Sequence, residues 1–146
     1  MEPMLRRFTC LISLMCLLAS CGELERAISV HDAWVRQIQP SQSVTAGYMK
    51  IHNKGEVEDR LLSVASPAFD AVELHEMAVD KNSVMRMRKS GPLSIRQGQT
   101  LALKRGGFHL MLIGPRYPIA SGNDIPLILE FEVAGEIAVP ARVRAD

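Results

Sequence analysis

Residues 73–111 read ELHEMAVDKNSVMRMRKSGPLSIRQGQTLALKRGGFHLM and contain three pairs of donor side chains, each pair separated by one residue. The pairs are His75 with Met77, Met85 with Met87, and His109 with Met111. Residues two apart in an extended strand point to the same face, so each pair can aim two donors at one point. The spacing therefore predicts strands whose shared face carries imidazole and thioether groups.

This donor set favours a copper site. Imidazole and thioether, with no thiolate and few carboxylates nearby, suit Cu(I) better than a hard cation or a structural zinc ion. A single methionine in a strand more often fills a gap in the core, and this is the expectation for Met49. His31 and His52 stand alone and are expected at the surface. His75 and His109 are candidate ligands only when the two are considered together.

The rest of the chain predicts an all-β protein. No long window shows helical spacing, and short alternating segments are separated by turn residues about every 8–12 positions, as in an antiparallel sandwich or barrel. Trp34 is expected in the core. A short piece around Leu93 and Ile95 lies between two turns. The predicted strands cover residues 31–36, 45–53, 59–64, 71–77, 84–88, 101–103, 108–113, 127–133 and 136–143.

The N-terminus is typical of a targeting segment. Arg6 and Arg7 precede an apolar run over residues 8–19, which has the length of a secretory signal. That run is shorter than the roughly 20 apolar residues that span a bilayer. The run ends in Leu-Ala-Ser-Cys at residues 18–21, which resembles the lipobox of bacterial lipoproteins.

The lipobox resemblance implies cleavage before Cys21 and lipidation of its thiol, which would anchor the chain to a membrane. We therefore expect a signal peptide over residues 1–20, a tether over 21–30 and one folded domain over 31–146. The alternative is an ordinary secretory signal cut near Ala19, which would leave a soluble periplasmic protein.

Charge and cysteine content exclude several classes. The 17 Lys+Arg and 16 Asp+Glu are scattered along the chain, so no clustered basic face indicates a nucleic-acid partner. Cys10 and Cys16 would leave with the signal, and Cys21 would be lipidated. The mature domain then has no thiol for a disulfide or for a blue-copper site of the His₂Cys type.

Six segments together resemble the periplasmic PCu(A)C-type copper chaperones, in that family's order. The family's metal motif is His-x10-Met-x21-His-x-Met. Here 21 residues separate Met87 from His109, but 11 separate His75 from Met87. The extra residue is expected in the turn over residues 80–83. Whether Met85 or Met87 faces the metal stays open, and the spacing to His109 favours Met87. The segments are DAWVR (32–36), TAGYMKIHNKG (45–55), DRLLSVASPAF (59–69), VELHEM (72–77), VMRMR (84–88) and GGFHLMLIG (106–114).

The resemblance implies a cupredoxin-like antiparallel β-sandwich or Greek-key barrel that binds one Cu(I) near its surface. The implied ligands are His75, Met87, His109 and Met111, and Met77 and Met85 stay open as additional ligands. Glu73 or Glu76 could orient a ligand histidine.

The resemblance also implies a monomeric metallochaperone, not an enzyme, at the periplasmic face of the bacterial cell envelope. Its partners would be a copper-accepting subunit of respiratory cytochrome oxidase and Sco-type thiol proteins. Two alternatives remain: a lipoprotein that stores or sequesters copper in the envelope, and a β-sandwich assembly module whose methionines are core. No nucleophile–base pair, carboxylate dyad or phosphate-binding loop indicates an enzyme.

Overall fold

The computed structural model describes residues 27–145, which form ten β-strands and no helix. The prediction of an all-β protein is therefore confirmed. The predicted signal peptide and Cys21 lie outside the described residues. The strands are β1 (Ile28–Arg36), β2 (Val44–Asn53), β3 (Asp59–Ala65), β4 (Phe69–Val79), β5 (Met85–Lys89), β6 (Leu93–Ile95), β7 (Thr100–Leu103), β8 (Phe108–Pro115), β9 (Asp124–Phe131) and β10 (Gly135–Arg144).

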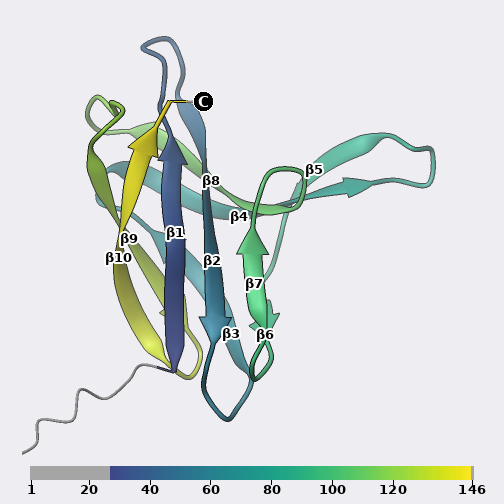
Figure 1. Ribbon diagram of the computed structural model, residues 1–146. Coiled ribbons are helices and arrows are strands. Elements are labelled where there is room, and N and C mark those ends of the chain that lie inside the picture. The colour runs from purple at the N-terminus through teal and green to yellow at the C-terminus, as the bar shows by residue number, and fades with distance from the viewer. Residues whose placement is uncertain (1–26, 146) are drawn as a thin grey trace, which may run out of the picture.

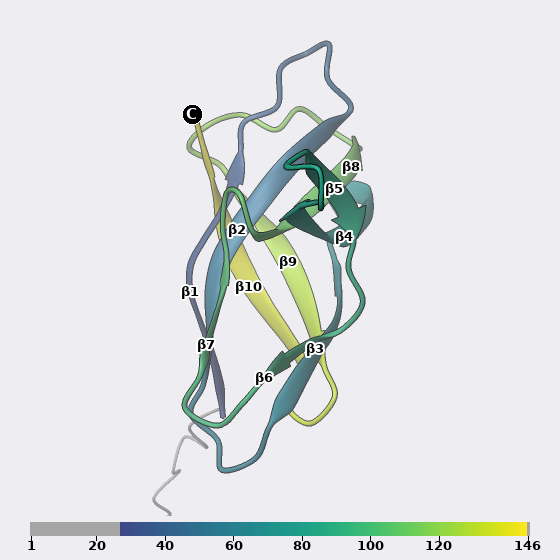
Figure 2. The same ribbon diagram turned by 90° about the vertical axis from the view of Figure 1, so that its right-hand side faces the viewer.

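The strands belong to one continuous sheet that bends back on itself (Figures 1 and 2). Their order is β5-β4-β8-β2-β1-β10-β9-β3-β6, and β7 pairs with β2 beyond the end of β8. Buried side chains from β2, β4 and β8 share one cluster with those from β3, β9 and β10. The fold is thus a β-sandwich around a single hydrophobic core. No helix long and apolar enough to cross a bilayer occurs among the described residues.

Alternation along the strands fills this core. In β8, Leu110 and Leu112 are completely buried, whereas Met111 between them is partly exposed. A strand places successive side chains on opposite faces, so burying the leucines turns the intervening residues outward. Met49 is 2% exposed, which confirms that it belongs to the core.

The expectation that Trp34 belongs to the core is wrong. Val35 is fully buried, so the alternation of β1 turns its neighbour Trp34 to the outer face. There the indole packs on Tyr48 with ring centroids 4.6 Å apart, and the guanidinium groups of Arg105 and Arg144 each lie 5.6 Å from its centre. The tryptophan therefore contributes to a partly solvated aromatic–cationic cluster.

Two further features differ from the sequence-based expectation. The first strand begins at Ile28, three residues before the predicted strand and inside the predicted tether, because Ile28 is buried and pairs with Asn53. The pairings are antiparallel except that of β1 with β10, which is parallel and aligns Trp34 with Arg142. The sheet is therefore mixed at this one pair and antiparallel at the other pairs of the described strands.

The hairpin of β4 and β5 projects from the body of the sandwich (Figure 1). The inner part of β4 pairs with β8, and its outer part pairs with β5. Every residue of β5 is exposed. The hairpin therefore extends the donor-rich strands beyond the core, and pairing with β8 fixes the base of the hairpin.

Candidate metal centre

The register of β5, β4 and β8 brings the predicted ligands to one face. His75 on β4 lies directly opposite His109 on β8, and Met77 lies opposite Met87 on β5. Met111 lies opposite Glu73, two pairs further along β8. Directly opposed residues share a face, so His75, Met87, His109 and Met111 all project to the same side of these three strands.

The opposite side of the same strands anchors them. Leu74 and Leu110 form the pair between the two donor-bearing pairs, and both point into the core with exposures of 6% and 0%. Shifting either strand by one residue would bury the polar donors and expose the leucines. Core packing therefore fixes the direction in which the histidines and methionines point.

The histidines form the buried part of the site and Met87 the exposed part. His109 is 7% exposed, and 12% of the His75 side chain is accessible. Their ring centroids are 6.1 Å apart. Met87 is 49% exposed on the projecting hairpin. Met87, His109 and Met111 line a cavity of about 230 Å³, whose wall also includes Arg36 and Thr45.

A hydrogen bond sets the orientation of the His109 ring. Its Nδ1 lies 3.0 Å from the carbonyl oxygen of Gly107, which also accepts the backbone N–H of Met77 at 3.2 Å. A carbonyl can only accept, so Nδ1 carries the proton and Nε2 keeps its lone pair. His109 therefore offers Nε2 to a metal, and the turn before β8 holds it in place.

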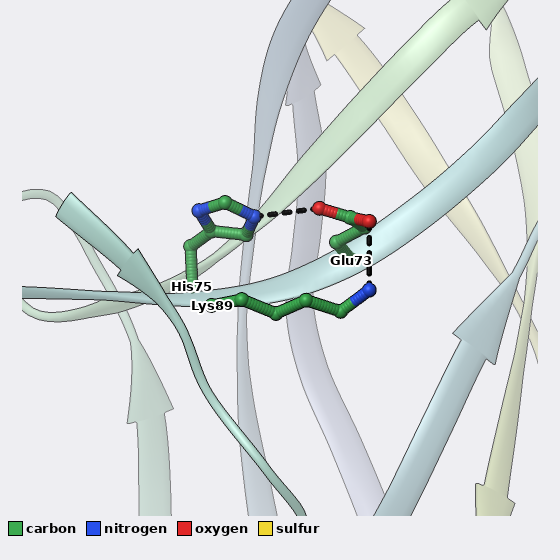
Figure 3. A network of polar contacts seen from close by, with 3 residues as sticks. All are labelled: Glu73, His75 and Lys89. Carbon is green, nitrogen blue, oxygen red and sulfur yellow. Dashed lines mark hydrogen bonds and ion pairs between the residues drawn. The ribbon is translucent and has the colours of Figure 1, made fainter.

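The His75 ring is held through its Nε2, whereas the His109 ring is held through its Nδ1. Its Nε2 lies 2.8 Å from Glu73 Oε2, and the second carboxylate oxygen accepts a hydrogen bond from Lys89 Nζ at 2.8 Å (Figure 3). These bonds, His75 first and Lys89 second, lower the pKa of Glu73 below its usual value. His75 Nδ1 is buried and has no hydrogen-bond partner.

Met77 and Met85 also lie on the donor face. Met77 sits directly opposite Met87, while Met85 sits opposite Val79 near the tip of the hairpin and is 60% exposed. Along the pairing of β4 with β5, Met87 is therefore nearer than Met85 to the position opposite His75. This arrangement favours Met87 as the ligand, and the roles of Met77 and Met85 stay predictions.

Asp80 closes the turn between β4 and β5, where the extra residue of the motif was expected. Its carboxylate accepts the backbone N–H groups of Asn82 and Val84 at 2.9 and 3.0 Å, and Arg86 Nε donates to it at 2.7 Å. Ser83 adopts a positive φ of 59°, a conformation that short polar residues tolerate in turns. These bonds order the tip of the hairpin, beyond the last pair of the ladder, Val79 with Met85.

Acidification is expected to loosen this tip. The hydrogen bond from Arg86, followed by those from Val84 and Asn82, lowers the pKa of Asp80 below its ordinary value of 3.8. A carboxyl group with a lowered folded-state pKa stabilises the fold above its unfolded-state pKa and loses that contribution as the pH falls through the folded value. Heteronuclear ¹H–¹⁵N NOEs of residues 80–86 should therefore fall below pH 3.8 but not between that value and neutrality.

The matched variant for this prediction is Asp80→Asn. It should show reduced NOE values at neutral pH. These values should not fall further as the pH drops below 3.8, because the variant has no carboxyl group at this position to protonate. A tip that stays equally ordered at low pH in the unaltered protein would contradict the prediction.

Sequence reasoning missed three residues around the site. Gly107 acts through its carbonyl oxygen, which no side-chain motif reveals. Lys89 comes from β5, whose pairing with β4 places it opposite His75, and Arg36 lies in the wall of the cavity. The i, i+2 pattern continues from Met85 and Met87 to Lys89, and this signal could have placed Lys89 there.

This face presents imidazoles and thioethers, and the carboxylate of Glu73 beside them is bonded to His75 and Lys89. Among residues 27–145, no cluster of three or more His, Cys, Asp or Glu side chains could hold a metal ion. A metal ion bound here would have two nitrogen ligands and one or more sulfur ligands, and such a ligand set is soft. The class defined by fold and site is a small β-sandwich that presents histidine and methionine donors at its surface.

Comparison with known families identifies the family of this chain. Residues 28–143 match the family model described as "Putative lipoprotein LpqE-like", and the chain belongs to this LpqE-like family. A relative from Leifsonia xyli subsp. xyli (strain CTCB07), named "Putative lipoprotein Lxx21020", is 32% identical over 125 residues, covering 83% of this chain and 73% of the relative.

Solved structures that resemble this chain include PCuAC domains and DR1885. The apo PCuAC domain from PmoF1 superposes with a TM-score of 0.71 at 24% identity, covering 82% of this chain and 95% of that domain. The Cu(I) form of DR1885 from Deinococcus radiodurans has a TM-score of 0.63 at 27% identity, covering 88% of this chain and 84% of that one. The resemblance to PCu(A)C proteins and the cupredoxin-like fold are therefore confirmed.

Proposed function

We propose that this protein is an extracytoplasmic copper metallochaperone that carries one Cu(I) through His75, Met87, His109 and Met111. The observation that carries the proposal is the register of β5, β4 and β8, which gathers two imidazoles and two thioethers on one face. Neutral imidazole and thioether donors need no deprotonation near neutral pH and match the softness of Cu(I). The Cu(I) form of DR1885, which shares the fold, supports the choice of cargo.

The exposure pattern favours transfer over permanent storage. The two histidines are largely buried, whereas Met87 stands half exposed on a projecting hairpin. A ligand from an acceptor protein could replace the exposed thioether first while the imidazoles still hold the ion. A storage site would instead be expected to enclose its cargo on all sides.

The proposal includes the cell envelope as the place of action. The matched family and the Leifsonia relative are both named as lipoproteins, which supports lipidation of Cys21 and anchoring at the periplasmic face. The acceptor would be a copper-accepting subunit of cytochrome oxidase, with a Sco-type thiol protein as a further partner. The protein would hand over its ion without catalysing a reaction.

The test is a Cu(I) titration of residues 22–146, a form that contains every strand described above, against a colorimetric Cu(I) chelator. One tightly bound equivalent, weakened by Met111→Leu, is expected, because leucine keeps the volume of methionine but removes the sulfur. Failure to compete with the chelator would refute the copper site and favour the assembly-module alternative.

A second experiment separates transfer from storage. The Cu(I)-loaded protein is mixed with a purified oxidase copper-binding domain, and the copper content of each is measured after separation. Movement of copper faster than its spontaneous release into chelator supports the chaperone. Movement no faster than that release supports storage.

A further inference from the structure

The two histidines of the site differ in which ring nitrogen is already occupied. His109 uses Nδ1 to donate to the Gly107 carbonyl, whereas His75 uses Nε2 to contact Glu73. The remaining nitrogen of His75, Nδ1, is shielded from solvent and has no hydrogen-bond partner. A buried polar atom without a partner is uncommon in proteins and calls for a physical explanation.

The hydrogen bond between His75 and Glu73 fixes the tautomer of His75. The two oxygens of Glu73 take one bond each, from His75 and from Lys89, and both are 2.8 Å long. An ionised carboxylate only accepts, so the neutral imidazole must place its proton on Nε2 and its lone pair on Nδ1. Lys89 lies opposite His75 on β5 and holds the carboxylate from the strand that carries Met87.

We propose that Glu73 is a positioning residue that makes His75 present Nδ1 to copper, while His109 presents Nε2. The inference rests on the copper site proposed above and adds which atoms bind and what holds them. A metal ion at Nδ1 would give this buried atom the partner that it lacks. Figure 3 shows Nδ1 on the side of the ring away from Glu73, so a metal there would not displace the carboxylate.

Glu76 does not share this role. It precedes Met77 on the same strand, but it pairs with Arg88 at 2.8 Å and points to the opposite side of β4 from His75. The two glutamates thus form a matched pair for experiment: same strand, same charge, each in an ion pair with β5, and only one in contact with a ligand histidine.

The first measurement is the tautomer of His75 in the apo protein, read from long-range ¹H–¹⁵N correlation spectra of histidine-labelled residues 22–146. The Nε2–H form is expected for the unaltered protein and for Glu76→Ala. Glu73→Ala should give a mixture of the two tautomers, and Glu73→Gln should recover much of the Nε2–H form, since its amide oxygen still accepts. An Nδ1–H form in the unaltered protein would overturn the proposal.

The second measurement is Cu(I) binding by the same variants. Removing the outer partner of a ligand histidine typically lowers metal affinity about 10–100-fold, and this loss is expected for Glu73→Ala. Glu76→Ala should stay within about threefold of the unaltered protein, since it contacts no ligand. On loading, the His75 Nδ1 resonance should shift while Nε2 keeps its proton.

Each outcome bears on one of the two proposals. Loss of the Nε2 proton on loading, or an affinity of Glu73→Ala equal to that of the unaltered protein, would overturn the role of Glu73. If the unaltered protein binds no Cu(I), the copper function fails, and the apo tautomers still decide whether Glu73 positions His75.

Discussion

Replacing His109 with alanine is expected to weaken Cu(I) binding by more than about 100-fold, because loss of an outer partner alone costs about 10–100-fold and a ligand contributes more. His109 is the most central of the four predicted ligands. It faces His75 across the ladder and lines the same cavity as Met87 and Met111. The measurement is competition with a colorimetric Cu(I) chelator.

The matched control is His52→Ala. His52 lies on β2, where its Nδ1 is 2.9 Å from Thr100 Oγ1, and it takes no part in the donor face. Its removal should leave Cu(I) affinity unchanged. Thermal unfolding of the apo variants would show that both stay folded. If His109→Ala bound Cu(I) as tightly as His52→Ala, the metal centre would have to lie elsewhere.

Asp59→Ala is expected to lower the free energy of unfolding by about 2–4 kcal/mol, since hydrogen bonds to a charged group contribute about 1.5–3 kcal/mol each. Asp59 is 3% exposed at the start of β3. One oxygen accepts the backbone N–H groups of Arg60 at 2.7 Å and Val133 at 2.9 Å, and the other accepts that of Ala134 at 2.9 Å. A single carboxylate thus connects β3 to the turn between β9 and β10.

Urea unfolding of the apo protein measures this effect, with an unchanged m-value as the sign that the unfolded state is the same. Asp124→Ala is the control, because Asp124 is half exposed and forms a surface ion pair with Arg142 at 3.2 Å. Such pairs contribute about 0–1 kcal/mol. Equal stabilities of the two variants would show that the buried carboxylate does not hold the turn.

Local patterning explains how much of the fold could be predicted. The alternation of Leu110 and Leu112 with His109 and Met111 is visible in the sequence, and it correctly indicated which residues turn outward in β8. The same rule, applied to Val35 and Trp34, was outweighed by the general preference of tryptophan for the interior, and that prediction failed. The parallel pairing of β1 with β10 joins the first and last described strands, and no local pattern encodes it.

The candidate site could be predicted as a set of residues but not as a geometry. The resemblance to the PCu(A)C motif implied His75, Met87, His109 and Met111 as ligands, yet the opposition of His75 and His109 depends on the pairing of β4 with β8. Choosing between Met85 and Met87 required the length of the turn closed by Asp80. Choosing between Glu73 and Glu76 required knowing which side of β4 each one faces.

The pairing of the first strand with the last has a kinetic consequence. β1 and β10 contact each other across more than 100 residues of chain, through pairs such as Val35 with Val143. Folds dominated by such distant contacts typically form in milliseconds to seconds, because the loop-closure entropy must be lost before the contacts form. During synthesis β1 emerges first and must wait for β10 with one edge unpaired. Until that strand arrives, the open edge can pair with another chain, so aggregation competes with completion of the sheet.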